Sequence, residues 1–153
     1  MAAVPLNLFQ KVRTKMSQTE PNLKQMLAQA GPYPLAAYNF VREGLGYTVE
    51  QSHGNHVDDM NALQSEDHHI NGQQLCLGLR DYAIEQYGML APAVLSHWNI
   101  HRTDDFGRIV FAMIDAGLMS KTDEDTIDDF RAVYNFQEAF SREQLLAHLA
   151  CRV

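Results

Sequence analysis

Residues 71–136 carry the strongest structural signals of the chain and read NGQQLCLGLRDYAIEQYGMLAPAVLSHWNIHRTDDFGRIVFAMIDAGLMSKTDEDTIDDFRAVYNF. Apolar residues recur there at helical spacing in three successive blocks. Asn71 and Thr103 stand before the first and third blocks as N-caps, and Gly117 follows the third block as a helix stop. The predicted helices cover about 72–87, 89–98 and 103–116.

Two extended segments are predicted after the third helix. Residues 118–122 are interpreted as a short strand, residues 123–129 (DEDTIDD) as an acidic turn, and residues 130–136 as a second strand. The period-two signature of the second strand places on one face Phe130, Ala132, Tyr134 and Phe136. Because two strands alone are only marginally stable, this hairpin must pack on the helices. The predicted fold is therefore mainly α with a small β-hairpin, in which a winged-helix-like C-terminal module packs with N-terminal helices.

The length of 153 residues predicts a single domain, 1–153, with room for a core. Within it we distinguish a helical N-terminal part, a polar His-rich loop, the winged-helix-like module and a C-terminal helix. These parts cover residues 1–51, 52–70, 71–140 and 141–153. The polar loop is long for a structureless connection, which indicates a mobile or functional segment.

Residues 1–51 predict three helices. The first carries a stripe at spacings of three and four, made of Leu6, Phe9, Val12, Arg13 and Met16. The second opens at Pro21 and the third at Pro34. In the third, Gly44 and Gly46 lower helix propensity. Either these small residues let another helix approach closely, or the helix breaks near Gly46.

The charge distribution constrains the partners of the protein. The net charge of −7 divides into +4 for residues 1–42 and −11 for residues 43–153. The predicted winged portion would therefore repel phosphates, and only the N-terminal portion would attract them.

Membrane and secretory signals are missing from the sequence. No apolar run approaches the roughly 18–20 residues that a spanning helix needs. At the N-terminus the apolar part precedes the basic part, which is the reverse of a secretory signal. Cys76 and Cys151 are too few for a disulfide framework, so we expect reduced thiols. These features predict a cytoplasmic protein that does not enter the membrane.

Two motifs resemble those of a small uncharacterised bacterial family, best known from planctomycetes and verrucomicrobia. The motif G-Q-x-L-x-x-G-x-R-D-Y-A is matched by Gly72, Gln73, Leu75, Gly78, Arg80, Asp81, Tyr82 and Ala83. The motif H-W-x-I-x-x-T-x-D-F-G is matched by His97, Trp98, Ile100, Thr103, Asp105, Phe106 and Gly107. The resemblance covers roughly residues 33–140. It supports a common fold unit and implies no activity.

A metal site is one hypothesis for the polar loop. Its histidines, with acids between them, are His53, His56, His68 and His69. Imidazole and carboxylate suit a transition metal such as zinc, but the loop lacks the thiolates of structural zinc sites and any H-E-x-x-H motif. A solvated polar loop is the competing interpretation, and we expect no cofactor.

The polar positions of the predicted module are the candidates for an interaction site. They comprise Arg80, Asp81, Trp98, Arg102, Asp104, Asp105 and Arg108. Trp98 is expected to be a core anchor, because burying it removes a large apolar area from water. Arg80 is expected to form a structural ion pair, with Asp105 as the candidate partner, or alternatively to bind a ligand.

Nucleic-acid binding through the third helix is disfavoured. In a winged helix its first residues face the bases, and here they are Thr103, Asp104 and Asp105, next to an acidic wing. A nucleic-acid contact would instead use the basic N-terminal residues, which are Lys11, Arg13, Lys15 and Lys24.

No catalytic motif such as G-x-S-x-G, a P-loop or G-x-G-x-x-G occurs in the sequence. We therefore expect a noncatalytic protein-interaction or adaptor module whose acidic turn and third-helix face meet a basic protein partner. One alternative is a nucleic-acid-associated regulator that acts through the N-terminal helices. The other is a metal-binding sensor or enzyme built on the His-rich loop.

Overall fold

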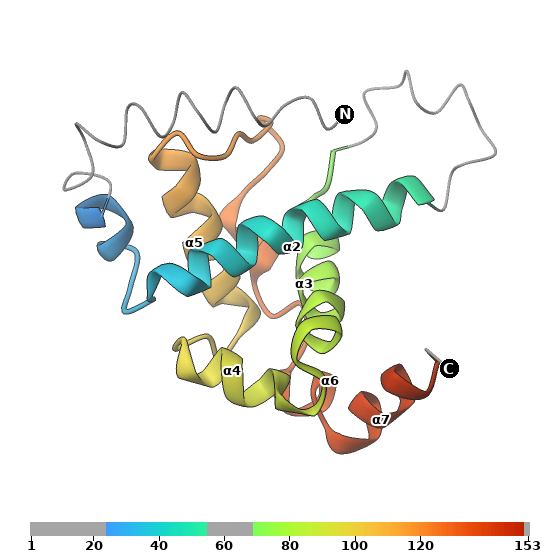
Figure 1. Ribbon diagram of the computed structural model, residues 1–153. Helices are drawn as coiled ribbons and strands as arrows, with labels where there is room; N and C mark the ends of the chain where they lie inside the picture. Colours follow the sequence, from blue (N-terminus) through green and yellow to red (C-terminus); the bar gives the residue numbers. More distant parts are fainter. Residues whose placement is uncertain (1–23, 55–68, 152–153) are drawn as a thin grey trace.

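The computed structural model describes residues 24–54 and 69–151, and all regular structure within these ranges is helical (Figure 1). A short helical segment at 24–28 precedes the elements that have full bounds. These are α2 (Leu35–Gly54), α3 (Gly72–Tyr87), η3 (Gly88–Leu90), α4 (Ala91–His97), α5 (Thr103–Asp115), η4 (Ile127–Phe130), α6 (Phe136–Ala139) and α7 (Arg142–Ala150). Within the described ranges, no helix combines the length and apolarity that a bilayer crossing requires.

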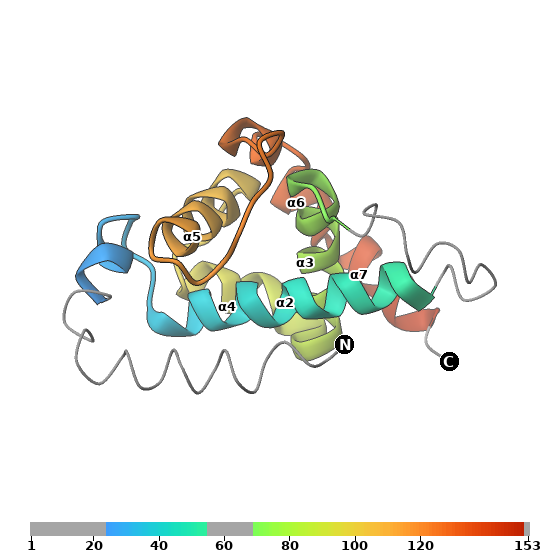
Figure 2. The same cartoon turned by 90° about the horizontal axis from the view of Figure 1, so that it is seen from above.

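Helix α2 runs across both α3 and α5, and the three helices enclose the core (Figure 2). The short helix α4 links the far ends of α3 and α5, while α6 and α7 follow the chain to its end beside α3 (Figure 1). Among the largest fully buried side chains are Phe106, Leu79, Ile84, Leu95, Ile100, Ile109 and Met113. Trp98 is buried too, with its ring centroid 5.4 Å from that of Phe40, as expected for a core anchor.

Helices α2 and α3 pack closely against each other in this core, and glycines make this possible. A Cβ added to Gly78 would lie 1.9 Å from the Thr48 hydroxyl oxygen, and one added to Gly44 would lie 2.3 Å from a methyl carbon of Leu79. The predicted close approach at Gly44 is therefore confirmed. The alternative, a break near Gly46, is wrong, because α2 continues to Gly54.

The helix caps follow the local sequence. Asn71 accepts a hydrogen bond from the Gln74 N–H at 2.8 Å, and its own N–H donates to the Gln74 side chain at 3.0 Å. This reciprocal pair satisfies two N–H groups that the first turn of α3 leaves without helical partners. At the start of α7, Ser141 Oγ accepts from the Gln144 N–H at 3.3 Å. The predicted N-cap Asn71 is confirmed, whereas Thr103 is the first residue of α5 and the N-cap position before it is occupied by Arg102.

The predicted β-hairpin, and with it the winged-helix fold, is wrong. The described residues contain no strand: residues 118–122 form bends and irregular chain, 127–130 form η4, and 136–139 form α6. Ala132, which the alternation placed inside a strand, has a φ of 47° and is exposed. Such a left-handed conformation turns the chain and cannot continue a strand.

The backbone partners of this region explain the error. The Ala132 N–H donates to Asp104 Oδ1 at 3.2 Å, and the Val133 N–H donates to Thr103 Oγ1 at 3.1 Å. The Thr103 hydroxyl in turn donates to the Phe130 carbonyl at 2.7 Å. Since side chains from the first turn of α5 satisfy these groups, the segment needs no neighbouring strand.

Phe130 locks the segment onto the helices. Its ring lies between Gly72 of α3 and Gly107 of α5, and a Cβ added to either glycine would come within 2.8 Å of Phe130 atoms. The side chain is 4% exposed. The segment that follows α5 is therefore held against both α3 and α5, and it forms one wall of a cleft.

Candidate functional site

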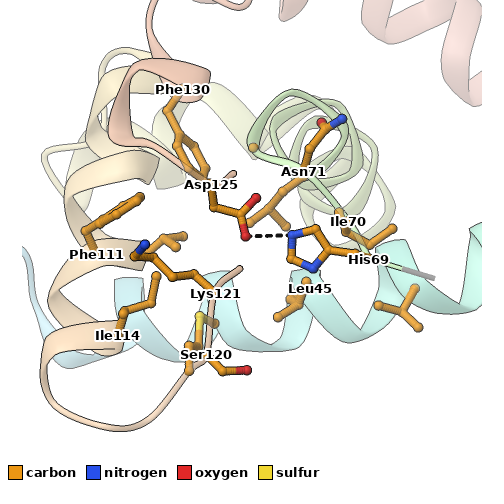
Figure 3. Close-up of a pocket in the computed structure, with 15 residues that line it drawn as sticks. Leu45, His69, Ile70, Asn71, Phe111, Ile114, Ser120, Lys121, Asp125 and Phe130 are labelled. Carbon is orange, nitrogen blue, oxygen red and sulfur yellow. Dashed lines mark ion pairs between the residues drawn. The ribbon is translucent and has the colours of Figure 1, made fainter. Parts of the chain in front are cut away.

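An apolar cleft of about 240 Å³ opens between α2, the start of α3, α5 and the irregular chain after α5 (Figure 3). Its apolar lining consists of Leu45, Val49, Ile70, Leu75, Val110, Phe111, Ile114, Met119 and Phe130. The other lining residues are His69, Asn71, Gly72, Ser120, Lys121 and Asp125. The cleft therefore has an apolar floor and a polar rim.

Helical spacing places the apolar lining. Leu45 and Val49 lie one turn apart on α2, and Val110 and Ile114 lie one turn apart on α5, so each pair falls on one face. Leu45, Val49 and Ile114 are half-buried, although the same stripes are buried closer to the core. The two helices thus leave part of their apolar faces uncovered at the cleft.

An ion pair joins two edges of the rim. His69 Nε2 lies 2.6 Å from Asp125 Oδ2, and Figure 3 shows the two side chains facing each other. The same oxygen accepts from the N–H and the hydroxyl of Thr122, at 2.9 and 3.3 Å. Partial burial raises the pKa of the Asp125 carboxyl, but the bonds from Thr122 and His69 outweigh it, and the pKa is lowered overall. The carboxylate is therefore held ionised at the edge of the cleft.

An acidic rim extends from this ion pair. A shallower hollow beside the cleft shares with it His69, Asn71 and Asp125, and adds Gln73, Thr122, Asp123, Glu124 and Asp129. Asp123 and Glu124 are exposed, whereas Asp129 accepts a hydrogen bond from the Thr126 N–H at 3.0 Å. Residues 121–131 contain five carboxylates against Lys121 and Arg131, so the rim is negative.

Two of the predicted interaction residues have structural roles at the core. Trp98 is 9% exposed and packs among aromatic rings. Asp105 is 6% exposed, and its carboxylate accepts from the N–H groups of His101 and Arg102 at 2.8 and 3.0 Å. It also accepts from the hydroxyl of Tyr33, whose pKa burial and this carboxylate raise to about 12. Asp105 therefore caps α5 and ties the segment before α2 to it.

The remaining predicted interaction residues form local pairs. The expected pairing of Arg80 with Asp105 is wrong, because Arg80 Nε lies 3.0 Å from Asp81 Oδ1. Arg108 lies on the surface of α5, 3.7 Å from Asp105. Asp104 binds the Ala132 N–H, and it lines a shallow hollow at the start of α5 together with Arg102.

The residues of the metal and nucleic-acid hypotheses fall mostly outside the described part of the chain. The side chain of His53 and all of His56 and His68 lie outside it, and His69 pairs with Asp125. Among the side chains that the structure places, no three His, Cys, Asp or Glu residues gather as metal ligands. Lys11, Arg13 and Lys15 also lie outside the described residues, and Lys24 is exposed.

Sequence reasoning missed the cleft. In the sequence, Leu45, Val49 and Ile114 belong to apolar stripes at helical spacing, which are typical of a core, and His69 was grouped with the other histidines. No local signal joins His69 to Asp125, because the contact depends on how α3 and the chain after α5 pack. Comparison with models of known protein families, with curated proteins and with solved structures gives no match, so the geometry alone guides the interpretation.

Proposed function

We propose that this protein is a noncatalytic interaction module that binds a segment of a partner protein, in which one apolar side chain is flanked by lysine or arginine. The observation that carries the proposal is the continuity of the apolar cleft with the acidic rim through His69, Asn71 and Asp125. A partner segment would insert its apolar side chain between α2 and α5 and set its cations against the rim.

The size of the cleft favours a side chain over a small-molecule ligand. Sites for drug-sized ligands measure roughly 300–1,000 Å³, and the cleft measures about 240 Å³. That volume suits a single large apolar side chain such as leucine or phenylalanine. Burying one contributes about 1.5–3 kcal/mol, so the anchor would supply much of the affinity of a weak, transient complex.

The charges set the direction of the bound segment. The exposed carboxylates of Asp123 and Glu124 attract cations and speed encounter, an effect that salt screens. Lys121 lines the cleft and would repel cations on its own side. The basic flank of the partner is therefore expected next to residues 123–129, and the other flank next to Lys121.

The test is binding of short fluorescent peptides to the full-length protein, measured by anisotropy. Each peptide carries one central Leu or Phe with a pair of Lys on one side, and reversed and Lys-free versions are included. We expect Val49→Gln to weaken binding about tenfold, which corresponds to about 1.4 kcal/mol, or roughly half or more of the contribution of the anchor.

A charge variant and its matched control complete the test. Asp123→Asn with Glu124→Gln should weaken binding several-fold at low salt and have little effect at high salt. Glu138→Gln with Glu143→Gln removes the same charge from exposed positions on α6 and α7 and should leave binding unchanged. The proposal fails if no peptide binds, or if neither the cleft variant nor the rim variant changes the affinity of the peptides.

We also propose that the protein acts in the cytoplasm. Cys76 is buried, Cys151 is exposed, and both are free thiols, as is usual where glutathione keeps thiols reduced. The resemblance to an uncharacterised bacterial family is a hypothesis that adds no activity and no partner.

A further inference from the structure

We propose that the chain's own residues 5–16 occupy the apolar cleft and its acidic rim, and thereby compete with an external partner. This inference rests on the proposed function, since it names a second occupant of the same surface. The segment lies outside the described residues. Two observations support this occupant: the composition of the segment, and a groove that lies between the beginning of the described chain and the cleft.

The composition of residues 5–16 matches the partner that the cleft requires. Leu6, Phe9, Val12 and Met16 recur at helical spacing, and Lys11 and Lys15 stand directly before Val12 and Met16 in the sequence. The segment thus offers an apolar anchor with cations beside it. The segment lies within residues 1–42, whose net charge is +4, whereas the rim lies within residues 43–153, whose net charge is −11.

A groove beside the beginning of the described chain adjoins the cleft at Phe111. It measures about 390 Å³ and is lined by Met26, Gln29 and Ala30 on one side and by residues that include Phe111 and Ile127 on the other. Phe111 lines both this groove and the cleft, so the two hollows meet at this side chain. Met26 and Ile127 are 41% and 48% exposed, which leaves apolar surface along the route.

The connection is short enough to favour contact within one molecule. Residues 17–23 join the segment to the described chain, and seven residues span at most about 25 Å when fully extended. A flexible tether of this length that spans the distance to the cleft would give an effective concentration of order 1 mM. A contact whose dissociation constant is about 100 μM would therefore be about nine-tenths formed.

The first test measures how tightly an external peptide binds the cleft of the full-length protein when the internal segment is weakened. In Phe9→Ser with Val12→Ser, a labelled synthetic peptide of residues 1–20 should bind about tenfold more tightly than to the wild type, because the competing segment is weakened. Asn7→Ser with Gln10→Ser changes polar positions of the same segment and should behave as wild type. Circular dichroism establishes that each variant is folded. Equal affinity of the peptide for the wild type and the Phe9 variant would overturn the inference.

A charge swap identifies the contact itself. The nuclear magnetic resonance signals of the Val49 and Ile114 methyl groups report occupancy of the cleft. Lys11→Glu with Lys15→Glu should shift these signals towards those of the Phe9 variant, and adding Asp123→Lys with Glu124→Lys should restore them. No restoration would overturn the contact. Signals that depend on protein concentration would assign the occupant to a second copy and also overturn it.

The two proposals fail in different ways. If basic apolar peptides bind the cleft with the same affinity in the wild type and the Phe9 variant, the proposed function stands and the internal occupant is excluded. If those peptides bind neither protein, and the cleft methyl signals of the two proteins coincide, both proposals fail.

Discussion

Replacing Gly78 with alanine is expected to destabilise the protein by about 2 kcal/mol, although alanine is the better helix former. The added Cβ would lie 1.9 Å from the Thr48 hydroxyl oxygen and 2.7 Å from the Thr48 Cβ. Rotating Thr48 moves its oxygen away but leaves its Cβ in place, so α2 and α3 must separate. The rotation would also disturb the 2.7 Å bond from the Thr48 hydroxyl to the Gly44 carbonyl.

The magnitude follows from two opposing effects. Overpacking a close contact typically costs 1–3 kcal/mol, and a clash that involves a stiff Cβ belongs in the upper part of that range. Replacing a helical glycine with alanine returns up to about 1 kcal/mol. Gly46 of the same helix pair is the matched control, because it is exposed and a Cβ there meets nothing within 4 Å. Gly46→Ala should therefore stabilise the protein by roughly 0.5–1 kcal/mol.

The assay is thermal and urea unfolding of the full-length variants, followed by circular dichroism at 222 nm, the usual helix signal. A difference of about 3 kcal/mol between the two variants corresponds to roughly 6–12 °C in Tm for a chain of this size. A Gly78→Ala variant as stable as the wild type, or more stable, would refute the reasoning and show that α2 and α3 do not meet at these glycines.

Three further outcomes follow from the same contacts. Phe130→Ala should cost about 3–5 kcal/mol in urea unfolding, because it empties a buried site between two helices; a loss below about 1 kcal/mol would mean that the segment is not locked. For Asp125, whose pKa is lowered in the folded state, the stabilising contribution is fully present above the ordinary value of 3.8 and is lost as the pH falls through the lowered value. The stability difference between wild type and Asp125→Asn should therefore shrink in acid, and a pH-independent difference would exclude this linkage. Burial, with a smaller contribution from the carboxylate of Asp104, raises the pKa of the Cys76 thiol to about 12. A thiol reagent should therefore modify Cys151 in the native protein and Cys76 only after denaturation. Mass spectrometry of the labelled protein would show which cysteine has reacted.

The caps of α3 and α7 could be predicted because their signals are local. The Asn71–Gln74 and Ser141–Gln144 pairs each lie within one turn, so the residues that form a cap can be recognised from their spacing alone. The core role of Trp98 was likewise predictable, because few alternatives exist for so large an apolar side chain. These features need no knowledge of how the helices pack.

The strand prediction for residues 130–136 was wrong because alternating apolar residues fit both a strand and the irregular chain that the structure shows. In residues 130–136 every second residue is apolar, yet Ala132 turns outward and its N–H is bound by Asp104. That bond depends on the first turn of α5 lying nearby, which no pattern within residues 130–136 reveals. A period of two is evidence for a strand only when no side chain from elsewhere satisfies the backbone.

The cleft could not be predicted for a related reason. The stripes of α2 and α5 were visible, but not the point at which the two helices diverge and leave Val49 and Ile114 half-buried. The acidic residues were also visible, but their position beside this gap depends on the Phe130 contact. Site prediction therefore required the packing of α2, α5 and the chain between α5 and α6.

The two walls of the cleft, α2 and residues 119–129, differ in their backbone hydrogen bonds, and this difference affects the rates of amide hydrogen exchange. The α2 wall is a continuous helix with its own ladder of amide bonds, whereas residues 119–129 are tied down mainly by side chains and turn bonds at a few points. We expect such a segment to open locally, at a free energy below that of global unfolding. Its amides should therefore exchange long before those of α3. In the proposed complex, the acidic wall would therefore adjust to the inserted side chain while the helical wall keeps its shape.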